Sequence, residues 1–139
     1  MMAKRVYVFD TNIVSALNPS KNPALYRRFQ KHRDETLCLC EPIIFEVERG
    51  LEHTQSQQRL VEFRTNVIPL FVMLPVQLVD WRTAAKLWGD ARRHGRQFSD
   101  VDVLLAAITL RLNGILVTDD NDFASIPLIQ TENWLRNNS

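Results

Sequence analysis

Three absences narrow the class of protein to which this 139-residue chain belongs. It contains no apolar run near the ~20 residues that a membrane-spanning helix needs. The apolar segment after Lys4 and Arg5 stops at Asp10, which is too short for the core of a signal peptide. There is also no repeat and no low-complexity tract. We therefore expect a single globular domain, residues 1–139, that acts in the cytoplasm with no membrane partner.

Cysteine, histidine and net charge are scarce as well. Cys38 and Cys40 stand two residues apart in an apolar segment, so in a strand their side chains point to opposite faces and cannot readily bond each other. No CxxC or His–Cys pattern suggests zinc. The net charge of +1 excludes a global basic field, but basic residues crowd 27–33 and 92–96. Such clusters contact phosphate backbones in some proteins and are plain solvated helix faces in others.

Apolar segments of two kinds alternate along the chain. Short continuous runs predict strands at 5–9, 36–40, 71–76 and 114–118, with a weaker fifth at 127–131. Helical spacing predicts helices at 11–17, 23–33, 42–51, 56–68, 77–94 and 103–110. Strands that alternate with helices favour a parallel sheet with helices on both faces, an α/β fold.

The predicted helices differ in how much of their surface is apolar. The segment 103–110 is apolar nearly throughout, which is typical of a helix buried on all sides. The longest helix, 77–94, has one apolar stripe that we expect to face the core: Val79, Ala84, Leu87, Trp88 and Ala91. In 56–68 the expected inward residues are Leu60, Phe63 and Val67.

Acidic residues follow two of the predicted strands. Asp10 ends the first strand, and Asp119 and Asp120 end the fourth. The carboxyl ends of parallel strands meet at one edge of a sheet, where ligands bind in open α/β proteins. Two further acids, Glu46 and Asp102, interrupt apolar helices. We expect these side chains to gather at that edge.

Each of these acids also has a purely structural explanation. Asp10 can cap the helix that follows it, and Asp102 can form a capping box with Ser99. Glu46 can pair with Arg49 three residues on. The remaining acids can form a turn cluster: Asp119, Asp120 and Asp122. The joint occurrence of all four positions favours a function over four separate coincidences.

Four carboxylates at one place repel one another unless cations neutralise them. Oxygen ligands suit hard divalent ions, so we expect Mg²⁺ or Mn²⁺. We therefore expect the metal and the catalysis at Asp10, Glu46, Asp102 and an acid that follows the fourth strand. Such ions lower the pKa of a bound water and stabilise the oxygens of a phosphodiester. We expect Thr11 and Asn12 to hydrogen-bond a ligand, a water or a phosphate.

These blocks, in this order, resemble the PIN-domain ribonucleases of the VapC toxin type. The matching pieces are the first strand with "DTN" (residues 10–12), "FEVERG" (45–50), "FSDVDVLLAA" (98–107), "TDDNDF" (118–123) and "IQTENW" (129–134). The resemblance implies a three-layer α/β/α fold around a parallel sheet. It also implies Mg²⁺- or Mn²⁺-dependent cleavage of structured RNA, such as tRNA, by the toxin of a toxin–antitoxin pair that inhibits translation.

The resemblance further implies partners and site residues. Relatives form homodimers, and their antitoxins carry a C-terminal tail that blocks the acidic site and a part that binds operator DNA. Asp10, Glu46 and Asp102 match the family's acids, and the fourth acid is either Asp120 or Asp122. On this resemblance we assign catalysis to Asp10, Glu46, Asp102 and Asp120, and metal binding to Asp10, Asp102 and Asp120. Asp122 joins Thr11 and Asn12 as a residue expected to support the site or contact the substrate. Candidate RNA contacts lie in the second basic cluster: Arg92, Arg93 and Arg96.

Two alternatives to a nuclease toxin have to be weighed. Some PIN-like toxins act with their partner mainly as a DNA-bound autoregulator and have weak nuclease activity. A haloacid-type phosphatase also starts from a strand that ends in Asp, but it needs a second Asp two residues on, where this chain has Asn12. We therefore retain the regulatory alternative and discard the phosphatase.

Overall fold

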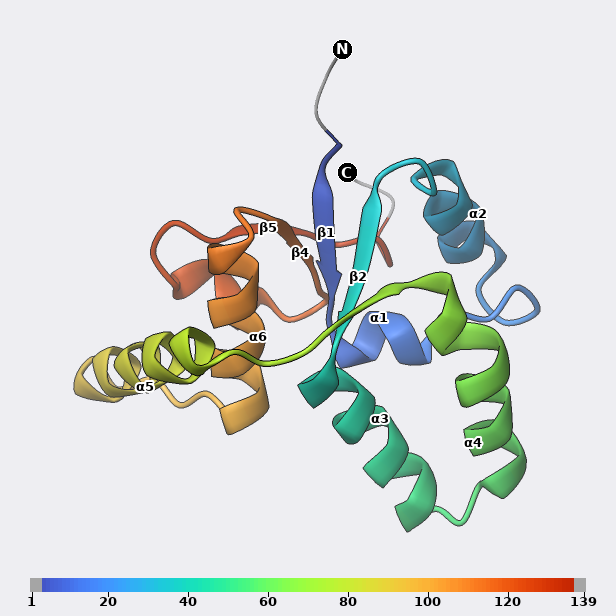
Figure 1. Ribbon diagram of the computed structural model, residues 1–139, viewed down its shortest axis with the longest axis horizontal. Coiled ribbons are helices and arrows are strands. Elements are labelled where there is room, and N and C mark those ends of the chain that lie inside the picture. Colours follow the sequence, from blue (N-terminus) through green and yellow to red (C-terminus); the bar gives the residue numbers. More distant parts are fainter. Residues whose placement is uncertain (1–3, 137–139) are drawn as a thin grey trace.

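The computed structural model describes residues 4–136 and contains a five-stranded sheet in which every pairing is parallel. The strand order is β3-β2-β1-β4-β5. The strands are β1 (Val6–Phe9), β2 (Thr36–Cys40), β3 (Val72–Leu74), β4 (Ile115–Val117) and β5 (Gln130–Glu132). The helices are α1 (Thr11–Ser15), α2 (Pro23–Lys31), α3 (Glu41–His53), α4 (Gln57–Glu62), α5 (Leu78–Arg93) and α6 (Asp100–Arg111). With α5 and α6 on one side of the sheet and α2 on the other, the predicted α/β/α fold is confirmed (Figure 1).

The central strand β1 joins the two layers of helices. Tyr7 and Phe9 point to the same face, since side chains alternate along a strand. The Phe9 ring lies 5.7 Å from Phe29 of α2, and the Tyr7 ring lies 5.3 Å from Trp134. Val8 is fully buried on the opposite face, where α6 packs on β1. Trp134 is itself buried, so the polar C-terminal segment contributes one large side chain to the core.

Two predicted elements have different bounds in the structure. The predicted helix 56–68 stops at Glu62 and continues as a π-helical turn, η1 (Phe63–Val67), and a 3₁₀ turn, η2 (Ile68–Leu70). Pro69 lies in η2, and proline has no N–H with which to continue an α-helix. The fifth strand begins at Gln130 and not at Pro127, because Leu128 has a left-handed backbone (φ 68°).

Helix α5 is less buried than its apolar stripe predicts. Ala84 is buried, and Leu87 and Ala91 are half-buried. Val79 and Trp88, however, are 50% and 39% exposed, which contradicts their assignment to the core. The reason is that α5 packs mainly against α6 and lies outside the sheet, so only one narrow face of it is covered.

The remaining expectations concern the cysteines and membrane spans. Cys38 and Cys40 are both buried and unbonded, as predicted, and burial raises the pKa of the Cys40 thiol to about 12. Between residues 4 and 136, no helix combines the length and the apolarity that crossing a bilayer requires.

Candidate active site

Asp10 lies where β1 ends and α1 begins, and it is only 6% exposed. Its carboxylate accepts the Thr11 N–H at 2.7 Å on Oδ1 and the Thr118 hydroxyl at 2.7 Å on Oδ2. Asp10 therefore does cap α1. Burial raises the pKa of Asp10, and the charges of Asp102 and Glu46 add to that rise, while the two hydrogen bonds oppose it.

Thr118 is a part of the site that our sequence reasoning missed. It ends β4, is buried, and donates to Asp10 while its oxygen accepts the N–H of Asp120 at 3.0 Å. One hydroxyl thus connects the ends of two neighbouring strands that are far apart in sequence. The only signal in the sequence was a hydroxyl residue at the end of an apolar strand, directly before the acids.

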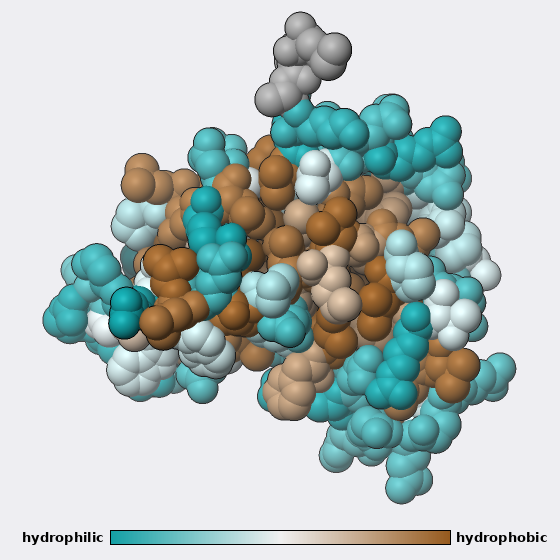
Figure 2. All heavy atoms as spheres, in the orientation of Figure 1, coloured by the Kyte–Doolittle hydropathy of each residue, from teal (hydrophilic) through white to brown (hydrophobic). Residues whose placement is uncertain are grey.

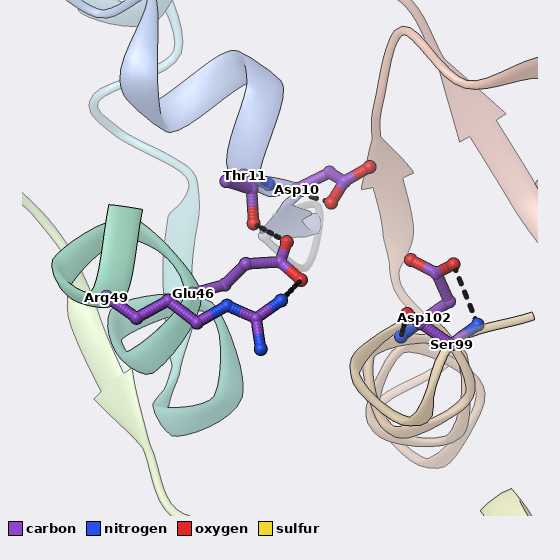
Figure 3. A network of polar contacts seen from close by, with 6 residues as sticks. All are labelled: Asp10, Thr11, Glu46, Arg49, Ser99 and Asp102. Carbon is purple, nitrogen blue, oxygen red and sulfur yellow. Dashed lines mark hydrogen bonds and ion pairs between the residues drawn. The ribbon is translucent and has the colours of Figure 1, made fainter. Parts of the chain in front are cut away.

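Glu46 approaches Asp10 from α3. One carboxylate oxygen accepts the hydroxyl of Thr11, and the other lies 3.4 Å from Nη2 of Arg49 (Figure 3). The suggested pairing of Glu46 with Arg49 is therefore present. The contact with Thr11 shows that Glu46 also faces the end of β1.

Asp102 enters from the first turn of α6. It forms the expected capping box, in which its own N–H donates to Ser99 Oγ at 3.1 Å and the Ser99 N–H donates to its Oδ2 at 3.3 Å. Burial raises the pKa of Asp102, as do the charges of Glu46 and Asp120, whereas the bonds with Ser99 oppose the rise. Asp102 is thus both a cap of α6 and a member of the acidic cluster.

The three acids after β4 have different surroundings. Asp120 accepts the N–H of Asp122 at 2.9 Å, caps the 3₁₀ turn η3 (Asn121–Ser125), and its charge reaches Asp102. Asp119 instead accepts from Asn133 at 2.6 Å and from Arg136 at 3.4 Å, which lowers its pKa. Asp122 is exposed in the first turn of η3.

The other predicted site residues lie further out. Asn12 accepts the backbone N–H of Asp119 at 3.4 Å, so it contacts the backbone of the loop that carries the acids. Arg92 stacks 4.3 Å from the Trp88 ring centre, and Arg93 pairs with Asp90. Arg96 donates to the carbonyl of Ser125 in η3 at 3.5 Å, which brings it nearest to the acidic loop.

The donor set has the chemical character of a site for a hard cation. The acids present only carboxylate oxygens, and hydroxyl groups are their neighbours, which suits Mg²⁺ or Mn²⁺ in kind. Over residues 4–136, however, no three His, Cys, Asp or Glu side chains converge closely enough to hold a metal ion. The carboxylates are instead turned toward hydroxyl, N–H and guanidinium donors.

A groove of about 870 Å³ opens beside the acids, between α1, α3 and the segment from α4 to η2. Thr11 and Glu46 lie on its border with the acidic cluster. Apolar side chains form much of the remaining wall: Val14, Leu17, Tyr26, Val47, Leu51, Phe63, Val67 and Leu70. Glu46 is the member of the acidic cluster that lines this groove.

The structure thus defines an α/β domain with acids from separate elements at the carboxyl edge of a parallel sheet, the edge where open α/β sheets bind ligands. The family follows from sequence comparison: the PIN domain model matches residues 7–128, so the chain belongs to the PIN domain family. No curated protein sequence matches the chain significantly.

Several solved structures share the fold. VapBC2 from Rickettsia felis, bound to a promoter DNA fragment, has a TM-score of 0.82 at 20% identity, covering 93% of this chain and 98% of that one. DNA-bound VapBC from Salmonella typhimurium also has a TM-score of 0.82 at 20% identity, with 96% and 99% covered. VapC20 of Mycobacterium tuberculosis, a toxin that cleaves the sarcin–ricin loop, has a TM-score of 0.65 at 16% identity, with 88% and 98% covered.

Proposed function

We propose that this protein is a Mg²⁺- or Mn²⁺-dependent endoribonuclease, the toxin of a VapBC-type toxin–antitoxin pair. The observation that carries the proposal is the acidic cluster, in which Asp10, Glu46, Asp102 and Asp120 come from four different elements. Repulsion and burial make such a cluster unfavourable for folding, so its presence indicates a function. The substrate is structured RNA such as tRNA, whose cleavage in the cytoplasm inhibits translation.

Asp10, Asp102 and Asp120 are the proposed metal ligands, and Glu46 completes the catalytic set. A bound Mg²⁺ or Mn²⁺ supplies a water of lowered pKa and positive charge for the phosphodiester oxygens. Thr118 and the Thr11 N–H orient the Asp10 carboxylate, and the Thr11 hydroxyl holds Glu46.

Supporting roles go to the outer residues. Asn12 and Asp122 shape the loop that carries Asp120. The exposed basic residues at and after the end of α5 are candidates for RNA backbone contacts: Arg92, Arg93 and Arg96. Phosphate contacts by such residues position a nucleic acid without reading its sequence. Of the two candidates for the fourth acid, we choose Asp120, because it is half-buried and its N–H is bonded to the Thr118 hydroxyl that also holds Asp10, whereas Asp122 is exposed.

Two protein partners belong to this proposal. The apolar groove that ends at Glu46 suits the C-terminal tail of a cognate antitoxin, which would cover the acids. A second copy of the chain suits an exposed apolar area that we call the β3–α5 face: Val72, Met73, Leu78, Val79 and Trp81. The segment from β3 to α5 crosses the front of the molecule, where Figure 2 shows apolar side chains gathered. Contiguous apolar surface of this kind marks interaction sites.

A second candidate function is a DNA-bound autoregulator with weak nuclease activity. It is favoured by the Rickettsia felis and Salmonella typhimurium structures, in which VapBC complexes are bound to DNA. In such a complex this chain would reach operator DNA only through its antitoxin. Expression without the antitoxin separates the candidates, because growth should stop only if the chain cleaves RNA.

The decisive experiment is cleavage of bulk tRNA and ribosomal RNA by the purified chain with Mg²⁺, with Mn²⁺ or with EDTA. We expect cleavage with either ion, none with EDTA, and at least a 100-fold loss for Asp10→Asn, since a metal ligand is removed. Asp119→Asn is the matched control. Asp119 is the neighbour of Asp120 in the loop after β4, but its carboxylate faces Asn133 and Arg136. Equal rates for wild type and Asp10→Asn would reject the site.

A further inference from the structure

Arg49 stands beside the acidic cluster, one turn along α3 from Phe45. Its guanidinium lies 5.2 Å from the centre of the Phe45 ring and 3.4 Å from Glu46. Figure 3 shows it on the side of the Glu46 carboxylate opposite Thr11. A cation is thus held next to the acids by one aromatic ring and one carboxylate.

Most of the hydrogen-bonding capacity of Arg49 is still available. A guanidinium has five N–H donors in a planar fork. Within residues 4–136, only Nη2 of Arg49 donates to a protein acceptor, and at 3.4 Å that bond is long. The side chain is 56% exposed, so the other donors face solvent at the edge of the cluster. Such donors match the oxygens of a phosphate.

A second arginine–glutamate pair, between Arg64 of η1 and Glu48 of α3, has a different geometry. Arg64 donates to both oxygens of Glu48, with Nε at 3.1 Å and Nη2 at 2.6 Å, although its side chain is equally exposed at 54%. The fork of Arg64 is therefore occupied by its own acid. The guanidinium of Arg49 contacts Glu46 through one nitrogen and stacks over the Phe45 ring.

An RNA substrate has a reason to need a cation at this position. Each phosphodiester carries a negative charge, and four carboxylates repel it as it approaches the scissile position. A guanidinium at the border of the cluster offsets part of that repulsion and forms charge-assisted hydrogen bonds. The basic residues at and after the end of α5 make other contacts within residues 4–136: Arg92 with Trp88, Arg93 with Asp90 and Arg96 with Ser125.

We propose that Arg49 contacts a phosphate oxygen of the RNA at the cleavage site, and that Phe45 positions its guanidinium for this contact. The inference rests on the proposed ribonuclease function and assigns to that site a residue that binds substrate. Arg49 touches the substrate, whereas Phe45 acts through Arg49 and is a positioning residue.

Cleavage of bulk tRNA at saturating Mg²⁺ or Mn²⁺ tests the contact. Arg49→Ala should lower kcat/KM by roughly 10- to 100-fold, the usual effect of losing a hydrogen bond to a charged group. Arg49→Lys should recover part of the loss, because it keeps the charge but not the fork. Arg64→Ala, which removes an equally exposed arginine from an ion pair with α3, should stay within about 2-fold of wild type. Phe45→Leu should show a smaller loss in the same direction as Arg49→Ala.

A binding measurement excludes a merely structural effect. The affinity for labelled tRNA is measured at several salt concentrations in the inactive Asp10→Asn variant, with and without Arg49→Ala. Loss of one phosphate contact should reduce the slope of log K against log salt by about 0.7 to 0.9. If wild type cleaves while Arg49→Ala matches Arg64→Ala in rate and the salt slope is unchanged, the inference is wrong. If wild type cleaves no RNA with either ion, the proposed function fails instead, and the salt slope still decides whether Arg49 contacts RNA.

Discussion

The pair Asp80–Arg111 offers the sharpest test of what holds α5 against α6. Asp80 is 1% exposed and accepts two bonds from Arg111, at 2.7 Å from Nε and 3.1 Å from Nη2. It also accepts the N–H of Gln77 at 2.9 Å as part of a capping box. Asp80→Ala therefore removes the acceptor of three hydrogen bonds and leaves a guanidinium without its partner.

The expected loss of stability follows from this burial. Removing one partner of a buried ion pair costs about 3–5 kcal/mol. The Arg111 side chain is 25% exposed, so water can solvate it partly, and we expect about 2–4 kcal/mol. A chain of this length loses ~0.3 kcal/mol per kelvin near its midpoint, so the Tm should fall by about 10 °C. This is a large share of the ~5–15 kcal/mol that folds a typical domain.

Thermal unfolding followed by circular dichroism, together with urea titration, measures this loss. Lys86→Ala is the matched control, since it breaks a 3.3 Å pair with Asp90 on the same helix whose lysine is 77% exposed. That control should change stability by less than 1 kcal/mol. In a double-mutant cycle, Asp80→Ala with Arg111→Ala should cost less than the sum of the single losses. A Tm for Asp80→Ala equal to that of Lys86→Ala would refute the reasoning.

Three further predictions concern the site and the surface. Burial and like charges raise the pKa of Asp10, so folding loses stability as pH rises from the ordinary carboxyl pKa through the raised one. Asp10→Asn should therefore unfold at a higher temperature than wild type in EDTA at pH 7, and the gap should shrink at pH 3; an equal gap at both pH values would contradict the pKa shift. Thr118→Val should lower the free energy of unfolding by about 2–4 kcal/mol and remove most of the cleavage rate, because Asp10 and the Asp120 N–H both lose a partner. Calorimetry measures the first effect and a cleavage assay the second, and unchanged values in both would show that the hydroxyl is dispensable. Met73→Lys should turn a dimer into a monomer in light scattering with little change in Tm, since Met73 is 55% exposed, and a monomeric wild type would rule out the β3–α5 face as an interface.

Much of the fold could be predicted because its signals are local. Buried parallel strands appear as continuous apolar runs, and α6, buried nearly all round, has no polar face. The positions of Asp10 and Asp120 followed from topology, since parallel strands end at one edge. The placement of both at strand ends was therefore predictable without any coordinates.

The errors came from features that depend on the rest of the molecule. Periodicity shows which face of α5 is apolar, but not whether another element covers it, and Trp88 proved to be exposed. The contact of Thr118 with Asp10 depends on β1 and β4 being neighbours, which the strand order decides. The stacking of Arg49 on Phe45 depends on a side-chain rotamer, for which a sequence contains almost no signal.

The bond between Thr118 and Asp10 spans 108 residues, and this separation has a consequence for biosynthesis. The ribosome makes β1 first, and it makes β4, which lies beside β1 in the sheet, only after all the helices from α1 to α6. A chain that stops before β4 therefore has Asp10 without Thr118 or Asp120. Assembly of the acids has to wait until β4 has been made, so a product that ends before β4 cannot form the cluster.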